Sequence, residues 1–185
     1  MKKVVCCMLV CMILLFGIAS VKAIDYDNQI KFNYKYNRAI TNTCYWIDSS
    51  ASGLTVHILS AANDWAGHSN PLNMTAVSSN YATHMDFYGK SDAFLGSDGT
   101  VGATYHYQNG GSYINPNNGS WFYADIYLNL ERAYHIQGTA AHEIGHALGL
   151  AHWNINLYSI MAQSSHRLVN TVQDIDNQHL NEIYS

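Results

Sequence analysis

The sequence has few cysteines and few basic residues. Of its four cysteines, three lie within the first eleven positions, and Cys44 is the only one in the rest of the chain. Without the N-terminal segment no internal disulfide can form, so the folded chain must depend on its core or on a bound metal. Nine basic residues stand against 13 acidic ones, and this balance argues against a nucleic-acid partner.

Long apolar runs are also absent beyond the N-terminus. Residues 1–23 begin with two lysines, continue with an apolar run from Val4 to Phe16 and end in small residues, which is the order of a secretory signal peptide. The run is shorter than the roughly 20 residues of a membrane-spanning helix, so we expect secretion and no stable membrane anchor. Cleavage is expected after Ala23, with Ala19 as the second site. The remaining chain would hold six basic and 13 acidic residues, a net charge of −7, which also suits the surface of an exported protein.

Residues 24–185 have the length of one domain with a single hydrophobic core. Apolar periodicity and composition favour helices in three segments, 53–66, 133–148 and 171–185. Thr171 and Asp174 form the expected capping pair of the last helix. Strand-forming residues between turn signals predict five short strands, within 43–48, 72–79, 83–89, 102–107 and 121–129.

Two segments between these strands, 91–100 and 108–120, are dense in Gly, Asn, Asp and Ser. They are expected to be surface turns. Their oxygen atoms suit Ca²⁺, but neither segment contains a twelve-residue calcium-loop pattern, so calcium stays an open alternative.

Histidines are concentrated in the segment AAHEIGHALGLAHW, residues 140–153. His142 and His146 are four residues apart, so on a helix their rings can reach a common point. Gly149 can adopt the left-handed conformation that ends a helix, and the turn would bring His152 back toward the other two.

Three imidazoles around Zn²⁺ leave the fourth tetrahedral position open, which is typical of a catalytic site. Water would occupy that position, and Glu143, beside the first ligand, could take its proton as the general base. Helical histidine pairs also occur in cores and on surfaces, but the full pattern of five residues is specific. We therefore predict one zinc ion held by His142, His146 and His152.

The segment HEIGHALGLAH, residues 142–152, resembles the long zinc motif of the metzincin metallopeptidases, and SIM at 159–161 resembles their methionine turn, with Met161 as its methionine. The short interval between His152 and Met161 is similar to that of the matrixins, the family of matrix metalloproteinase catalytic domains. The resemblance implies an α+β, zincin-like domain over residues 24–185. A twisted mixed sheet of about five strands and three helices would form it, with the zinc cleft between two subdomains.

The same resemblance implies a monomeric, zinc-dependent endopeptidase with a protein or peptide substrate. The substrate strand would pair with an exposed edge strand near GATYHY, residues 102–107. A peptidase restricted to one partner or to cell-wall peptide is the runner-up among enzymes.

Two features of matrixins are missing. No prosegment cysteine in a PRCG-type sequence precedes the domain, and the setting of Cys44 favours a buried structural thiol over a zinc-blocking switch. The histidines and aspartate of a second, structural zinc cannot be placed. His84, Asp86 and His106 are available, but their spacing differs and they are expected simply to lie on strand faces.

Two alternatives come from other classes. In a non-catalytic, zinc-bound protein-binding module the metal would only hold the fold together, but such a site has no need of Glu143 or of an open ligand position. In a gluzincin-type peptidase a glutamate from a later helix would be the third ligand, and Glu182 lies too close to the chain end for this role.

Overall fold

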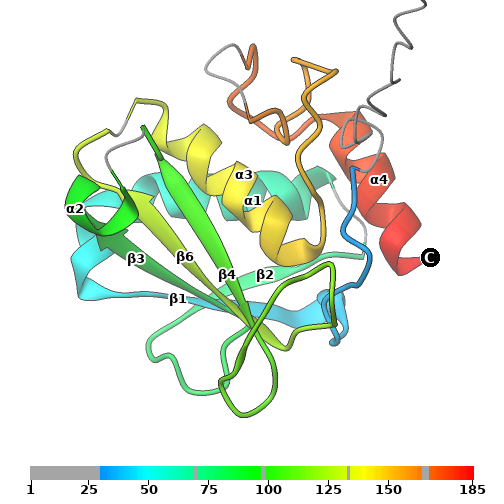
Figure 1. Cartoon of the computed structure of the whole chain (residues 1–185), viewed down its shortest axis with the longest axis horizontal. Coiled ribbons are helices and arrows are strands. Elements are labelled where there is room, and N and C mark those ends of the chain that lie inside the picture. The colour runs from blue at the N-terminus through cyan, green and yellow to red at the C-terminus, as the bar shows by residue number, and fades with distance from the viewer. Residues whose placement is uncertain (1–29, 69–70, 97–98, 133, 164–166) are drawn as a thin grey trace, which may run out of the picture.

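A single mixed sheet of six strands forms the framework of the domain (Figure 1). The computed structural model describes residues 30–185 except 69–70, 97–98, 133 and 164–166, so the predicted signal segment lies outside the described residues. The strands follow the order β2-β1-β3-β6-β4-β5. β1, β2, β3 and β6 are parallel, whereas β4 is antiparallel to both of its neighbours. Their bounds are β1 Thr43–Ile47, β2 Met74–Val77, β3 Met85–Lys90, β4 Gly102–Tyr107, β5 Tyr113–Ile114 and β6 Tyr123–Asn129.

Two long helices cover one face of this sheet, and a third lies beside its end (Figure 1). Helix α1 buries Ile58, Ala61, Ala62 and Trp65, which share one face because they recur every three or four residues. Helix α3 runs alongside β4 and is buried almost along its whole length. The helices are α1 Thr55–His68, α2 Asp92–Leu95, α3 Ile136–Leu148 and α4 Asp174–Tyr184, and 3-10 turns occupy Ile40–Asn42 and Ser49–Leu54.

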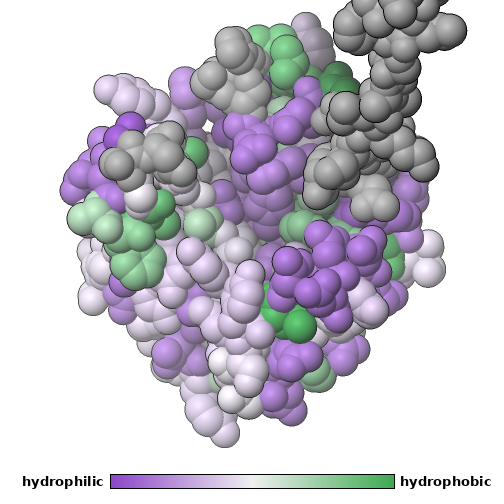
Figure 2. Space-filling view, viewed as in Figure 1, coloured by the Kyte–Doolittle hydropathy of each residue, from purple (hydrophilic) through white to green (hydrophobic). Residues whose placement is uncertain are grey.

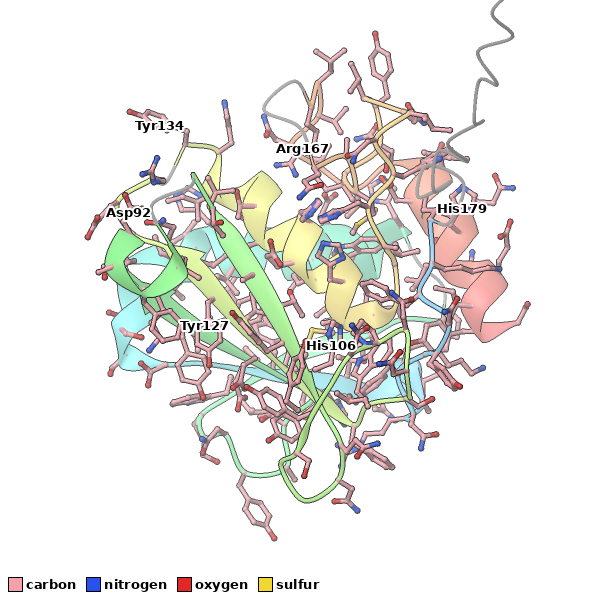
Figure 3. All side chains as sticks on the ribbon, viewed as in Figure 1. Asp92, His106, Tyr127, Tyr134, Arg167 and His179 are labelled. Carbon is pink, nitrogen blue, oxygen red and sulfur yellow. The ribbon has the colours of Figure 1, made fainter. Side chains whose placement is uncertain are left out.

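Side chains alternate between the two faces of the sheet. Phe87 and Ile126 point toward the helices and are fully buried, and each such side chain stabilises the fold by roughly 1.5–3 kcal/mol. Tyr88 and Tyr127 point to the opposite face, where their rings stack with centroids 5.4 Å apart. Figure 3 shows Tyr127 on the side of the sheet away from α3.

The predicted fold class is confirmed, and its details need three corrections. The sheet has six strands because Tyr113–Ile114, in a segment predicted as a turn, pairs with the end of β4 through only two residues. The other predicted turn contains the single-turn helix α2. Helix α4 is capped by Gln173 and Asp176, which exchange side-chain and backbone hydrogen bonds, and the predicted pair of Thr171 and Asp174 is wrong.

The chain beyond Gly149 forms the smaller part of the domain and ends in α4 (Figure 1). Within the described residues, no helix combines the length and the apolar character needed to cross a membrane. The face seen in Figure 2 is largely hydrophilic, and its hydrophobic residues form separate small patches.

Candidate metal centre

The structure brings together the three histidines that the sequence singled out. Nε2 of His146 lies 3.0 Å from Nε2 of His142 and 3.0 Å from Nε2 of His152. Among the described residues these three form the one group of potential metal ligands, with ligand atoms within 4.8 Å of one another. Two come from one face of α3, and the third comes from the chain that returns after Gly149.

The protonation of the rings suits a cation. Nδ1 of His142 donates to the carbonyl of Ile160 at 2.7 Å, and Nδ1 of His146 donates to that of Leu150 at 2.8 Å. Burial lowers the pKa of His142 to about 3 and also lowers the pKa values of His146 and His152. Neutral rings that donate through Nδ1 direct the lone pairs of Nε2 to the shared point, so this donor set fits Zn²⁺.

The turn that delivers His152 depends on Gly149. This residue has φ 113°, a left-handed conformation that glycine adopts without steric cost. The N–H of Gly149 donates to the carbonyl of His146, and the N–H of Leu150 donates to the carbonyl of Gly145. These two hydrogen bonds form a Schellman motif at the end of the helix.

Side chains from distant elements donate further hydrogen bonds to carbonyls at this buried helix end. Nε2 of His106 donates to His146 at 3.0 Å, Nε1 of Trp121 donates to Ala147 at 2.9 Å, and the Tyr184 hydroxyl donates to Leu148 at 2.8 Å. The last turn of α3 can therefore lie in the core without unpaired backbone groups.

The side chain of Glu143 extends from α3 toward β4. The hydroxyl of Thr104 is 2.7 Å from its Oε2 and 3.0 Å from its backbone carbonyl oxygen. Gly102 leaves room for the carboxylate, since a Cβ there would stand 2.7 Å from Oε1. Burial raises the pKa of Glu143 to about 7, while Thr104 and the charge of Arg167 act in the opposite direction. A carboxylate with this pKa can both accept and return a proton near neutral pH.

Met161 packs against helix α3. Its side chain is fully buried, and its sulfur packs directly on Gly145, where a Cβ would overlap it. The N–H of Met161 donates to Oγ of Ser159 at 3.0 Å. The predicted methionine turn therefore contacts α3 between the two helical histidines.

Asp176, a residue that the sequence analysis missed, holds this turn from α4. It is completely buried. Its carboxylate accepts from Oγ of Ser159 at 2.5 Å, from the N–H of Ile160 at 3.0 Å and from that of Gln173 at 2.9 Å. The carbonyl of the same Ile160 receives His142, so α4 supports a candidate metal ligand through one intervening residue. Only the capping-box spacing could have pointed to Asp176.

Among the described residues, the other histidines, Asp86 and Cys44 lie outside the histidine cluster. His84 accepts the N–H of Cys44, Asp86 on the outer face of the sheet accepts Thr83, and His106 on the inner face donates to α3. Cys44 is a half-buried free thiol on β1, which two strands, β3 and β6, separate from β4. His84, Asp86 and His106, the candidates for a second zinc site, therefore do not form a common cluster.

The edge of β4 nearest the centre is partly free. β4 pairs with β6 along its whole length, but β5 covers its other edge only at His106 and Tyr107. Residues 102–105 thus present an edge without a paired strand among the described residues, directly beside Glu143.

The family model described as Matrixin matches residues 33–185. A comparison with curated protein sequences gives no match.

Proposed function

The chain belongs to the matrixin family of zinc-dependent metallopeptidases, and from this premise we propose that it is an exported endopeptidase in which Glu143 is the general base. The observation that carries this role is a buried carboxylate directly after His142 and beside the histidine cluster. His142, His146 and His152 would hold the metal.

The proposed mechanism assigns the proton transfers to one residue. When bound, zinc polarises the carbonyl of the scissile bond and lowers the pKa of a water molecule. Glu143 accepts the proton of the attacking water and passes it to the nitrogen of the leaving amine. Thr104 orients the carboxylate through Oε2, which leaves Oε1 for the water. The partly free edge of β4 would hold the substrate as an additional strand.

Export is part of the proposal and rests on the order of residues 1–23. N-terminal sequencing of the protein from the culture medium of a secreting host should begin at Ile24, or at Ser20 if the second site is used. An uncleaved N-terminus in the cell pellet would refute export. We also propose that the domain acts as a monomer, which sedimentation of the zinc-loaded protein tests directly.

The decisive experiment compares residues 24–185 with Glu143→Gln, each with and without a chelator, on a mixture of denatured proteins. Glu182→Gln is the matched control, since Glu182 is exposed on α4. The parent and the control should cleave in a chelator-sensitive way, and Glu143→Gln should bind zinc but lose several orders of magnitude in rate. Equal activity in Glu143→Gln would overturn the assigned role, and zinc binding without cleavage by the parent would favour a protein-binding module.

A further inference from the structure

Arg167 is a half-buried cation beside the candidate active site that the mechanism above does not use. Its Nε donates to the carbonyl of Val169 at 3.0 Å and its Nη1 donates to that of Ile160 at 3.2 Å. The Ile160 carbonyl also receives His142. Arg167 and His142 therefore share the carbonyl oxygen of Ile160 as a hydrogen-bond acceptor.

No carboxylate pairs directly with this charge, although Glu143 and Asp176 act on it from a greater distance and partly offset the lowering of the Arg167 pKa by burial. Within the described part of the chain, no carboxylate oxygen lies within 4.0 Å of its nitrogens, whereas Arg132 contacts Asp92 at 2.6 Å. Two of the five N–H groups of Arg167 are used, and Nη2 has no partner among these residues. A partly buried guanidinium without a directly paired carboxylate is costly, so a ligand that brings a carboxylate to Nη2 would bind well.

A glycine on α3 makes room for Nη2. A Cβ on Gly138 would stand 2.9 Å from this atom and 2.7 Å from Oδ1 of Asn170. Gly138 lies one helical turn before His142, on the N-terminal half of α3. Figure 3 places Arg167 over this half and His106 toward the other end of the helix, and the surface over the middle of α3 is hydrophilic in Figure 2.

The position of Arg167 along a bound peptide follows from the strands. β4 runs in the direction of α3, because Gly102 faces Thr139 and Glu143 while His106 contacts His146. β5 occupies the far end of the same edge in the antiparallel sense. A substrate that continues along this edge in that sense would place its residues after the scissile bond toward Gly138 and Arg167.

We propose that the Arg167 guanidinium binds a carboxylate of the substrate on the C-terminal side of the cleaved bond. This inference rests on the proposed function and names its substrate class, peptides with an acidic residue or a free C-terminus there. Guanidinium and carboxylate match in charge and in planar, two-point geometry.

Cleavage rates provide the first test. Zinc-loaded parent, Arg167→Met and Arg167→Lys are compared on synthetic peptides that carry Glu or Gln at each of the first three positions after the cleaved bond. A second peptide series ends at each of these positions in either a free carboxylate or an amide, and it distinguishes recognition of a C-terminal carboxylate from recognition of a side chain. Arg38→Met is the control, because Arg38 contacts the carbonyl of Ala82, in the loop between β2 and β3.

The parent should favour the carboxylate by about tenfold to a hundredfold in kcat/KM. Arg167→Met should lose this preference and still cleave the neutral peptides, Arg167→Lys should keep part of it, and Arg38→Met should match the parent. Equal rates on both peptides in the parent would overturn the proposal. An equal loss on all peptides in Arg167→Met would also overturn it, since Arg167 would then only hold the Ile160 carbonyl.

Binding provides the second test, independent of turnover. The zinc-loaded Glu143→Gln protein, with and without Arg167→Met, is titrated with fluorescent peptides carrying Glu or Gln. A tenfold or larger affinity difference that disappears with Arg167→Met supports carboxylate recognition, and equal affinities refute it. A parent that cleaves no peptide while this difference persists would reject the proposed function alone.

Discussion

Replacing Asp176 should test whether α4 supports the metal centre. In Asp176→Ala the N–H of Ile160 and the hydroxyl of Ser159 lose their acceptor, and both residues are fully buried. Each buried unpaired group costs about 1–3 kcal/mol, so the free energy of unfolding should fall by roughly 2–6 kcal/mol. This is a large share of the 5–15 kcal/mol or so that a domain possesses.

The measurement is urea unfolding of the metal-free proteins, followed by titration with zinc. Asp174→Ala is the matched control on the same helical turn. Asp174 is exposed, so only its interaction with the helix dipole, about 0.3–1 kcal/mol, is lost. Asp176→Asn keeps an oxygen for Ile160 and can donate to Ser159, so it should cost only about 1 kcal/mol. Zinc affinity should fall by about tenfold to a hundredfold in Asp176→Ala, because the carbonyl that orients His142 moves. If Asp176→Ala and Asp174→Ala unfold alike and bind zinc alike, the support from α4 does not exist.

Three further predictions concern the core, the sheet and the general base. Gly145→Ala places a methyl group on the sulfur of Met161, so urea unfolding should show a free energy of unfolding lower by about 1–3 kcal/mol. Gly67→Ala is the control and should be neutral or stabilising, because a Cβ at Gly67 would have nothing within 4 Å. Equal effects of the two substitutions would contradict this packing. Burial raises the pKa of Asp86 from 3.8 to about 6, so the folded state binds its proton more tightly and stability is lost as pH rises from about 4 to above 6. Asp86→Asn should then be more stable than the metal-free parent by up to about 3 kcal/mol at pH 7.5 and equal to it at pH 4, and a gain that does not depend on pH would reject the assignment. Thr104→Val removes a hydrogen bond that lowers the pKa of Glu143, so the acidic limb of this variant's pH-rate profile should move to higher pH. Thr104→Ser keeps the hydroxyl and should keep the acidic limb of the parent. An unmoved limb in Thr104→Val would show that Thr104 does not act on the base.

Much of the framework could be predicted because it depends on local pattern. The spacing of Ile58, Ala61 and Trp65 predicts α1, and the alternation along β3 and β6 predicts their inner faces. β5 was missed because a two-residue strand has no period. The start of α4 was misplaced because Gln173 occupies a cap position that shorter polar side chains usually fill.

The histidine cluster could be predicted for a related reason. All three imidazoles and the glycine that turns the chain lie within eleven consecutive residues, so helix geometry and the turn at Gly149 bring them together. The supporting residues could not be predicted. Thr104, Arg167 and Asp176 reach the site from β4, from the segment after Met161 and from α4, and only the tertiary packing of these elements defines their contacts.

The most direct test of the central claim is X-ray absorption at the zinc edge of the zinc-loaded protein and of His152→Ala. We predict one zinc per chain with three imidazole nitrogens and one oxygen in the parent, and weaker binding with one imidazole fewer in His152→Ala. A sulfur ligand or a fourth imidazole that closes the coordination sphere would contradict the open catalytic site described here.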